Sequence, residues 1–209
     1  MTGAAIALLL AAAVPAVTPN RLPPIELCRG DADFDRFRAA LVGAVEAKNA
    51  GTIRDLVASD VRTSFGGDGG WDEFATTWGL DTDPAASKLW AQLQSLFALG
   101  CAPTQAGGRV FPSLFQNSGE DTDPFELVVA RPGAGLFAKA GDARPVATLD
   151  WHSARQVDPV GEGDWVNVSL FDGREGWLKA SDTLSPLGYR LVAERREGRW
   201  LIAALVAGD

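Results

Sequence analysis

The feature that most constrains this fold is a change of pattern near residue 107, where helical spacing gives way to short strands. Before that point apolar residues recur at intervals of three and four, and after it short apolar runs are separated by Gly and Pro. The first pattern is typical of amphipathic helices, whereas closely spaced short runs are typical of a small barrel or sandwich. The sequence therefore predicts an α+β fold with its helices in the first half.

Two helices, a strand, a short helical piece over residues 71–80 and a third main helix are expected in that first half. The first helix has an apolar stripe made of Phe34, Phe37, Leu41 and Val45. Either Asp31 or Asp33 can cap its start. A second, shorter helix begins at Thr52, and the alternation within residues 60–65 predicts a strand after it. The third helix is expected to begin at Pro84, because proline is favoured at the first helical position.

The end of the chain predicts a long β-hairpin over residues 185–209. Two apolar runs flank the turn residues Glu197 and Gly198. The second run is almost continuously apolar, so we expect both of its faces to be covered. This hairpin is predicted to pack back on a helical α+β domain over residues 17–120. The short strands of residues 125–184 then form an insertion between the two.

Residues 1–16 have the pattern of a signal peptide. The apolar run of residues 4–14 is shorter than the roughly 20 residues that a membrane-spanning helix needs. Val14 and Ala16 place small residues at the −3 and −1 positions of a cleavage site. The alternative is a buried N-terminal helix, since no Lys or Arg precedes the run. We expect a periplasmic or secreted protein without stable membrane insertion after signal cleavage.

Cys28 and Cys101 are the only two cysteines of the chain. A single pair of thiols in an exported protein predicts one disulfide. The alternatives are two buried free thiols or a lipid anchor at Cys28. Glu26 and Leu27 argue against the anchor, because small residues are expected before a lipidated cysteine.

Charge and composition exclude several classes of partner. The chain has 19 basic and 27 acidic residues, a net charge of −8, which disfavours nucleic acid and anionic lipid surfaces. One histidine and two cysteines are few side chains for the three or four ligands that a zinc site usually needs. Neither a metal nor a cofactor is therefore predicted. His152 and Ser153 are adjacent and would point to opposite faces of a strand, so no catalytic residue is assigned.

Residues 125–184 resemble a bacterial SH3 (SH3b) domain. The resemblance is carried by residues 165–168 (WVNV) and 172–178 (DGREGWL), with Leu184 after them, and more loosely by the preceding strands. It implies an SH3-like small β-barrel. Residues 135–140 lack the usual Arg and Pro, so no ligand role is carried over to that loop.

Within this pattern, five residues have a specific expected role. The Asp-Gly pair is expected to form a tight hairpin turn, and Gly176 to allow close backbone approach. We expect Trp165 and Trp177 to fill the core of a barrel too small for a large aliphatic interior.

The candidate ligand-binding residues are Trp151, Asp172 and Arg174, at the rim of the predicted barrel. Trp151 offers a flat apolar face, and Arg174 can grip a carboxylate of the kind that peptidoglycan stems carry. The alternative is that Arg174 pairs with Asp172 or Glu175 on the surface.

The predicted function is therefore non-catalytic binding of a cell-envelope peptide, peptidoglycan or another envelope protein. The whole layout looks like that of uncharacterised exported bacterial SH3-domain proteins, which implies no activity. The first hundred residues also vaguely resemble the opening of an NTF2-like cone. The alternative function is thus an NTF2-like small-ligand carrier or enzyme, whose apolar cavity would be lined by Phe65, Phe74, Trp78 and Phe111.

Overall fold

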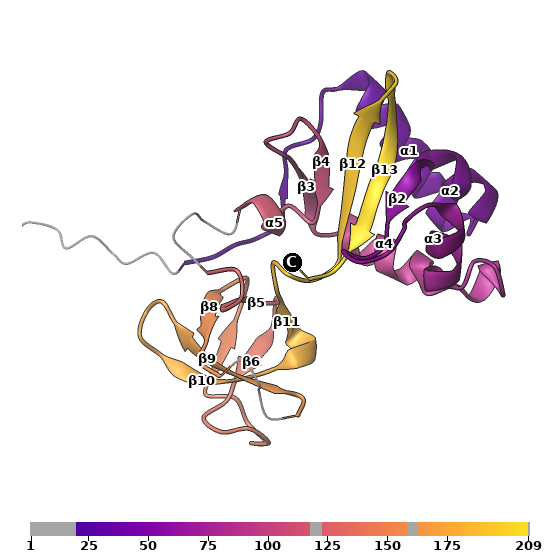
Figure 1. Cartoon of the computed structure of the whole chain (residues 1–209). Coiled ribbons are helices and arrows are strands. Elements are labelled where there is room, and N and C mark those ends of the chain that lie inside the picture. The colour runs from indigo at the N-terminus through magenta and orange to yellow at the C-terminus, as the bar shows by residue number, and fades with distance from the viewer. Residues whose placement is uncertain (1–19, 118–122, 159–162, 209) are drawn as a thin grey trace, which may run out of the picture.

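The chain folds as an α+β protein with two separate cores, one formed by helices and a six-stranded sheet and the other by the remaining strands (Figure 1). This computed structural model describes residues 20–117, 123–158 and 163–208. The predicted signal peptide of residues 1–16 lies outside the described residues. None of the helices in the described ranges combines the length and the apolar character that a membrane span requires.

The helical unit, as we call residues 20–117 and 189–208, is built on one six-stranded sheet. Its elements are β1 (Ile25–Glu26), α1 (Ala32–Glu46), α2 (Ala50–Leu56), β2 (Val57–Arg62), α3 (Trp71–Trp78), a 3-10 turn (Pro84–Ala86), α4 (Leu89–Phe97), β3 (Gly100–Pro103), β4 (Arg109–Phe111), α5 (Leu114–Asn117), β12 (Arg190–Arg196) and β13 (Arg199–Val206). The strand order is β1-β3-β4-β12-β13-β2. The last hairpin of the chain, β12–β13, therefore lies inside a sheet whose other strands come from the first half.

The helices and this hairpin share one apolar core. Phe34, Leu41 and Leu93 from the helices and Leu191 and Ile202 from the hairpin are all fully buried in it. The ring of Trp200 on β13 lies edge-on to that of Phe34, with centroids 5.0 Å apart. An apolar face of each element is thereby removed from water, which is the main stabilising term for such a fold.

The first two helices begin where a side chain caps the backbone N–H groups of the first turn. Asp31 caps α1, because its carboxylate accepts hydrogen bonds from the backbone N–H groups of Asp33 and Phe34. The second helix begins at Ala50, so the predicted start at Thr52 is wrong. Asn49 is its cap and accepts from the Thr52 N–H at 3.0 Å, which draws the residues between them into the first turn.

The strand β2, at one edge of the six-stranded sheet, also begins earlier than expected. Because α2 runs directly into β2, the strand starts at Val57 rather than at Asp60. Val57 pairs with Ile202 in parallel, and this register places Val61 in the core. Phe65, the end of the predicted strand, lies beyond β2 and is 54% exposed.

The third main helix begins at Leu89, so the expectation that it begins at Pro84 is wrong. Asp83 does act as a cap, but for a 3-10 turn, with its carboxylate 3.2 Å from the Ala86 N–H. Ser87 then takes an extended backbone conformation, and its hydroxyl donates to the Trp78 carbonyl at 2.6 Å. This bond ties the segment to α3 and interrupts the helical path.

The predicted disulfide between Cys28 and Cys101 is present, with the two Cα atoms 5.6 Å apart. It lies next to the parallel pairing of β1 with β3, in which Ile25 is opposite Gly100. Gly100 has φ +75°, and a Cβ there would collide with the Ile25 carbonyl. The cross-link therefore holds the chain before α1 against the strand that follows α4, and it fits an oxidising, extracytoplasmic location.

The β unit, as we call residues 123–184, contains the remaining strands. They are β5 (Leu127–Ala130), β6 (Ala134–Leu136), β7 (Ala147–Leu149), β8 (Ser153–Gln156), β9 (Trp165–Leu170), β10 (Glu175–Lys179), a 3-10 turn (Ala180–Asp182) and β11 (Thr183–Leu184). Five form an antiparallel sheet of order β10-β9-β8-β5-β11, and β6 pairs with β7. Among the described residues, β11 is an open edge of the five-stranded sheet, and β10 is joined beyond β9 only by an isolated bridge between Trp177 and Phe137. The strand pairing of these residues therefore does not close the five strands into a barrel.

The core of the β unit is aliphatic, which corrects the expectation for its two tryptophans. Its cluster consists of Val, Ala and Leu side chains and shares no residue with the core of the helical unit. Trp165 and Trp177 lie outside it and are half-buried. Strand alternation is the reason: Val168 and Leu170 point into the core, so Trp165 points to the other face of β9.

Removing the disulfide should destabilise the helical unit. A bridge between cysteines 73 residues apart stabilises by about 4 kcal/mol in the chain-entropy description. We expect the Cys28→Ser/Cys101→Ser variant to lose about that much unfolding free energy in urea titrations. Wild-type protein treated with a reductant is the control and should lose the same amount. Two thiols that alkylate in folded, unreduced protein would contradict the bridge.

Shortening Trp200 should cost far more stability than shortening Trp165. Trp200 is 7% exposed and packs on Phe34, so Trp200→Ala leaves a cavity and should lower the unfolding free energy by about 3–5 kcal/mol. Trp165→Ala, at a half-buried position outside both clusters, should cost about 1 kcal/mol. Equal losses in thermal or urea unfolding would show that the hairpin does not complete the core.

Candidate functional site

The predicted binding residues gather at one end of the β unit. Ala154 of β8 pairs with Leu170 of β9 in antiparallel register, so the residues just before Ala154 lie beside those just after Leu170. This register brings Trp151 to the same end of the sheet as Asp172 and Arg174. Asp172 and Arg174 belong to the β9–β10 turn, in which the Gly173 N–H donates to the Leu170 carbonyl at 2.9 Å.

Asp172 and Arg174 are bound to each other. The Nη2 and Nε atoms of Arg174 lie 2.6 and 3.0 Å from Oδ2 of Asp172, and the Arg174 N–H also donates to Oδ1. These bonds lower the pKa of the Asp172 carboxyl and raise the pKa of Arg174. The geometry agrees with the alternative of a surface pair, which contributes about 0–1 kcal/mol. Arg174 would have to release Asp172 before it could grip a ligand carboxylate with the same atoms.

Trp151 lies against the start of the described chain. The Leu22 N–H donates to the Trp151 carbonyl, and the Ser153 N–H donates to the Asn20 carbonyl, both at 2.8 Å. An ion pair joins Arg21 to Asp150 at 3.2 Å. Residues 20–22 therefore run along residues 150–153 like a short added strand, and they occupy part of this end of the β unit.

His152 and Ser153 are both engaged with backbone groups in the same region. The Nδ1 atom of His152 lies 3.0 Å from the Asp150 backbone nitrogen, and the Ser153 hydroxyl donates to the Asn20 carbonyl at 2.8 Å. Both side chains are buried. They are thus held by different partners and do not form a nucleophile–base pair.

A second candidate site lies at the opposite end of β9. A hollow of about 450 Å³ is lined there by Asp164, Trp165, Lys179, Ala180 and Ser181. Lys179 is directly opposite Trp165 in the β9–β10 pairing, so the two side chains stand on the same outer face of the hairpin. None of the residues that the structure describes forms an ion pair with Asp164 or Lys179. The hollow therefore offers an indole face between two unpaired charges of opposite sign.

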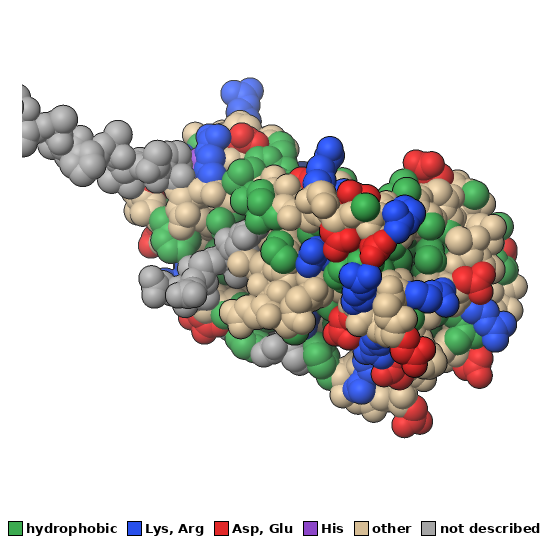
Figure 2. Space-filling model, turned by 90° about the horizontal axis from the view of Figure 1, so that it is seen from above, with side chains coloured by type: hydrophobic (Ala, Val, Ile, Leu, Met, Phe, Trp, Pro, Cys, Tyr) green, Lys and Arg blue, Asp and Glu red, His purple; other side chains and the backbone are tan. Residues whose placement is uncertain are grey.

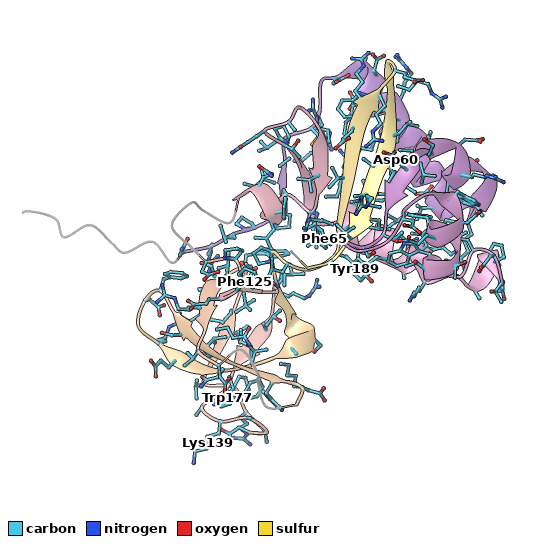
Figure 3. All side chains as sticks on the ribbon, viewed as in Figure 1. Asp60, Phe65, Phe125, Lys139, Trp177 and Tyr189 are labelled. Atoms are coloured by element: carbon cyan, nitrogen blue, oxygen red, sulfur yellow. A yellow bond between two sulfur atoms is a disulfide. The ribbon has the colours of Figure 1, made fainter. Side chains whose placement is uncertain are left out.

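The indole of Trp165 is fixed by the segment after β6. The Phe137 ring lies edge-on to it, with centroids 5.0 Å apart and planes at 86°. Phe137 in turn exchanges two backbone hydrogen bonds of 2.9 and 2.8 Å with Trp177 on β10. Trp177 and Lys139 mark the end of the β unit away from the helical unit (Figure 3).

Gly176 makes this contact possible, as the SH3b-like motif predicts. A Cβ at Gly176 would lie 2.6 Å from the Phe137 carbonyl oxygen, which is too close for any side chain. The expected close backbone approach is thus confirmed. Its consequence is that Phe137 and Trp165 form a fixed aromatic pair at the surface.

Sequence reasoning missed Trp165 as a site residue, although the signal was in the strand itself. Within β9, apolar Val166, Val168 and Leu170 alternate with Trp165 and two polar residues. This alternation assigns the tryptophan to the polar, outward face. The expectation of a core role rests on the need of so small a barrel for aromatic side chains to fill it, without regard to the face of the strand that the tryptophan occupies.

The ligand atoms of Glu26, Cys28 and Cys101 lie within 4.8 Å of one another, a spacing that could hold a metal ion. The two cysteines are oxidised to a disulfide, so neither offers the thiolate that a metal binds. Glu26 forms an ion pair with Arg38 at 2.6 Å. We therefore assign the cluster a structural role.

The four residues proposed for an NTF2-like cavity do not line a common hollow among the described residues. Phe74, Phe111 and Trp78 are at most 2% exposed and belong to the packed core of the helical unit, whereas Phe65 is on the surface. Outside this core, acidic and basic side chains are interspersed over the face seen in Figure 2. In the helical unit, Arg195 and Asp33 form an ion pair whose charged atoms lie 2.7 Å apart.

Comparison with known proteins gives no family for this chain. No family model, curated protein or solved structure matches it. Any function must therefore be argued from the residues of the chain itself.

Proposed function

We propose that this chain is a non-catalytic, exported protein that binds a cell-envelope peptide, peptidoglycan or another envelope protein. The β unit is its recognition module and is an SH3b-like domain. The Asp-Gly turn, the close approach at Gly176 and the antiparallel sheet with a core of its own support this assignment. The disulfide supports export, because such bonds persist in oxidising compartments.

The hollow at Trp165 is the observation that carries the proposal. A half-exposed indole held edge-on by Phe137 is a rigid apolar surface of the kind that dominates binding interfaces. Lys179 can receive a carboxylate of the ligand, and Asp164 can receive an amino group. Peptides carry both groups, so the charges on either side of the indole match a peptide placed across it.

Four candidate side chains for covalent chemistry are occupied in other ways. Both cysteines form the disulfide, and His152 and Ser153 are bound to separate backbone groups. This supports a binding role over the carrier or enzyme alternative, whose proposed cavity residues are packed into the core.

Removing the Trp165 side chain should weaken retention on envelope material. We expect wild-type protein to co-sediment with purified cell wall or envelope extract. Trp165→Ala should weaken retention about tenfold or more, the typical effect of losing a buried aromatic contact. Trp71→Ala, which shortens a half-buried tryptophan of the helical unit, is the matched control and should bind like wild type.

The same assay separates the two ends of the β unit. Trp151→Ala and Arg174→Ala remove the residues that the sequence predicted. If these variants lose retention while folded Trp165→Ala keeps it, the site is the Asp172–Arg174 end and our placement is wrong. Failure of wild-type protein to bind any wall or envelope fraction would remove the binding proposal itself.

A further inference from the structure

A cleft between the two units is the strongest feature that the proposed function does not use. It measures about 260 Å³ and is lined by α4, the segment after β4, β11 and the segment just before β12. These elements lie on either side of the junction between the helical and β units (Figure 1). The cleft is therefore formed only when the two units are in place.

The cleft has an apolar floor and a cationic rim. Leu96 and Leu99 contribute from the end of α4, and Leu184 contributes from β11. Arg131, which follows β5, is the only charged residue among those that line it. In a chain with a net charge of −8, a cleft with one cation and no carboxylate is suited to an anion.

Three polar groups at the cleft have unused hydrogen-bond donors. No described residue forms an ion pair with Arg131 or accepts a hydrogen bond from the hydroxyls of Ser185 and Tyr189. The Arg131 backbone is fixed, since its N–H donates to the Asp182 carbonyl at 2.8 Å. The Tyr189 ring is fixed by packing on Trp78, with centroids 5.2 Å apart. The Tyr189 ring is thus held in place at the cleft, and the Arg131 side chain extends to the cleft from a fixed backbone position.

We propose that this cleft binds a small carboxylate that bears a short apolar tail. The carboxylate pairs with the Arg131 guanidinium and accepts from the hydroxyls of Tyr189 and Ser185, while the tail lies on the leucines. A water molecule takes up about 30 Å³ of liquid, so the cleft has room for roughly eight or nine non-hydrogen atoms. Hexanoate has this size, and it is the probe for the test.

Hexanoate binding to the full chain, followed by amide NMR, tests the proposal. We expect saturable shifts at Leu99, Leu184 and Tyr189, with a dissociation constant on the order of 1 mM. Hexanamide, which has the same shape without the charge, should bind about tenfold more weakly. Arg131→Gln should weaken hexanoate binding by a similar factor, and Arg131→Lys should restore part of it.

Two further variants complete the design. Tyr189→Phe keeps the ring on Trp78 but removes the hydroxyl, and it should weaken binding severalfold. Arg144→Gln makes the same charge change at an exposed residue that does not line the cleft, and it should bind like wild type. Thermal unfolding of each variant checks that it is folded.

Three results would overturn the proposal. They are equal binding of hexanoate and hexanamide, unchanged binding by folded Arg131→Gln, and no saturable shift at roughly ten times the expected dissociation constant. Because Trp165 lies outside this cleft, Trp165→Ala should bind hexanoate normally. Failure here would thus leave the envelope-binding proposal intact, and the reverse also holds.

Discussion

The pairing of the C-terminal hairpin with strands from the first half of the chain holds the rest of the structure in place. β12 pairs with β4 on one side, and β13 pairs with β2 on the other. Without the hairpin, the apolar faces of α1 and α4 would lose the side chains of Leu191 and Ile202 that cover them. The hydrophobic core of the helical unit therefore depends on residues at the far end of the sequence.

The same pairing explains how the β unit can be inserted without disturbing the sheet. Phe111, at the end of β4, lies directly opposite Leu191, near the start of β12. The chain therefore leaves the sheet and returns to it at neighbouring positions. Residues 20–22 add a second connection, because they bond to residues 151–153 of the β unit just before β1 joins β3. These connections hold the junction at which the Arg131 cleft is formed.

Local patterns predicted most of the elements, because each depends on residues that are close in sequence. The stripe from Phe34 to Val45 gave α1, and the Asp-Gly pair gave the β9–β10 turn. The starts of β2 and α4 were misplaced because they are decided by contacts with distant residues, namely Ile202 for Val57 and Trp78 for Ser87.

The candidate sites were harder to predict than the elements. The structure does bring together Trp151, Asp172 and Arg174. The ion pair between Asp172 and Arg174, however, depends on the geometry of the turn. The contact at Trp151 depends on residues 20–22, which are far away in the sequence. The outward face of Trp165 was readable from alternation alone. The cleft at Arg131 and Tyr189 was beyond prediction, because it exists only through the placement of one unit against the other.

The most direct test of the account is an NMR titration of the tryptophan indole N–H signals with soluble peptidoglycan fragments. The chain has seven tryptophans. Their indole N–H signals therefore monitor each end of the β unit and the helical unit separately. The account predicts saturable shifts of the Trp165 indole and the Lys179 amide, with the Trp151 and Trp200 indoles unchanged. Shifts confined to Trp151 and the Asp172–Arg174 turn, or no saturable shift at all, would contradict it.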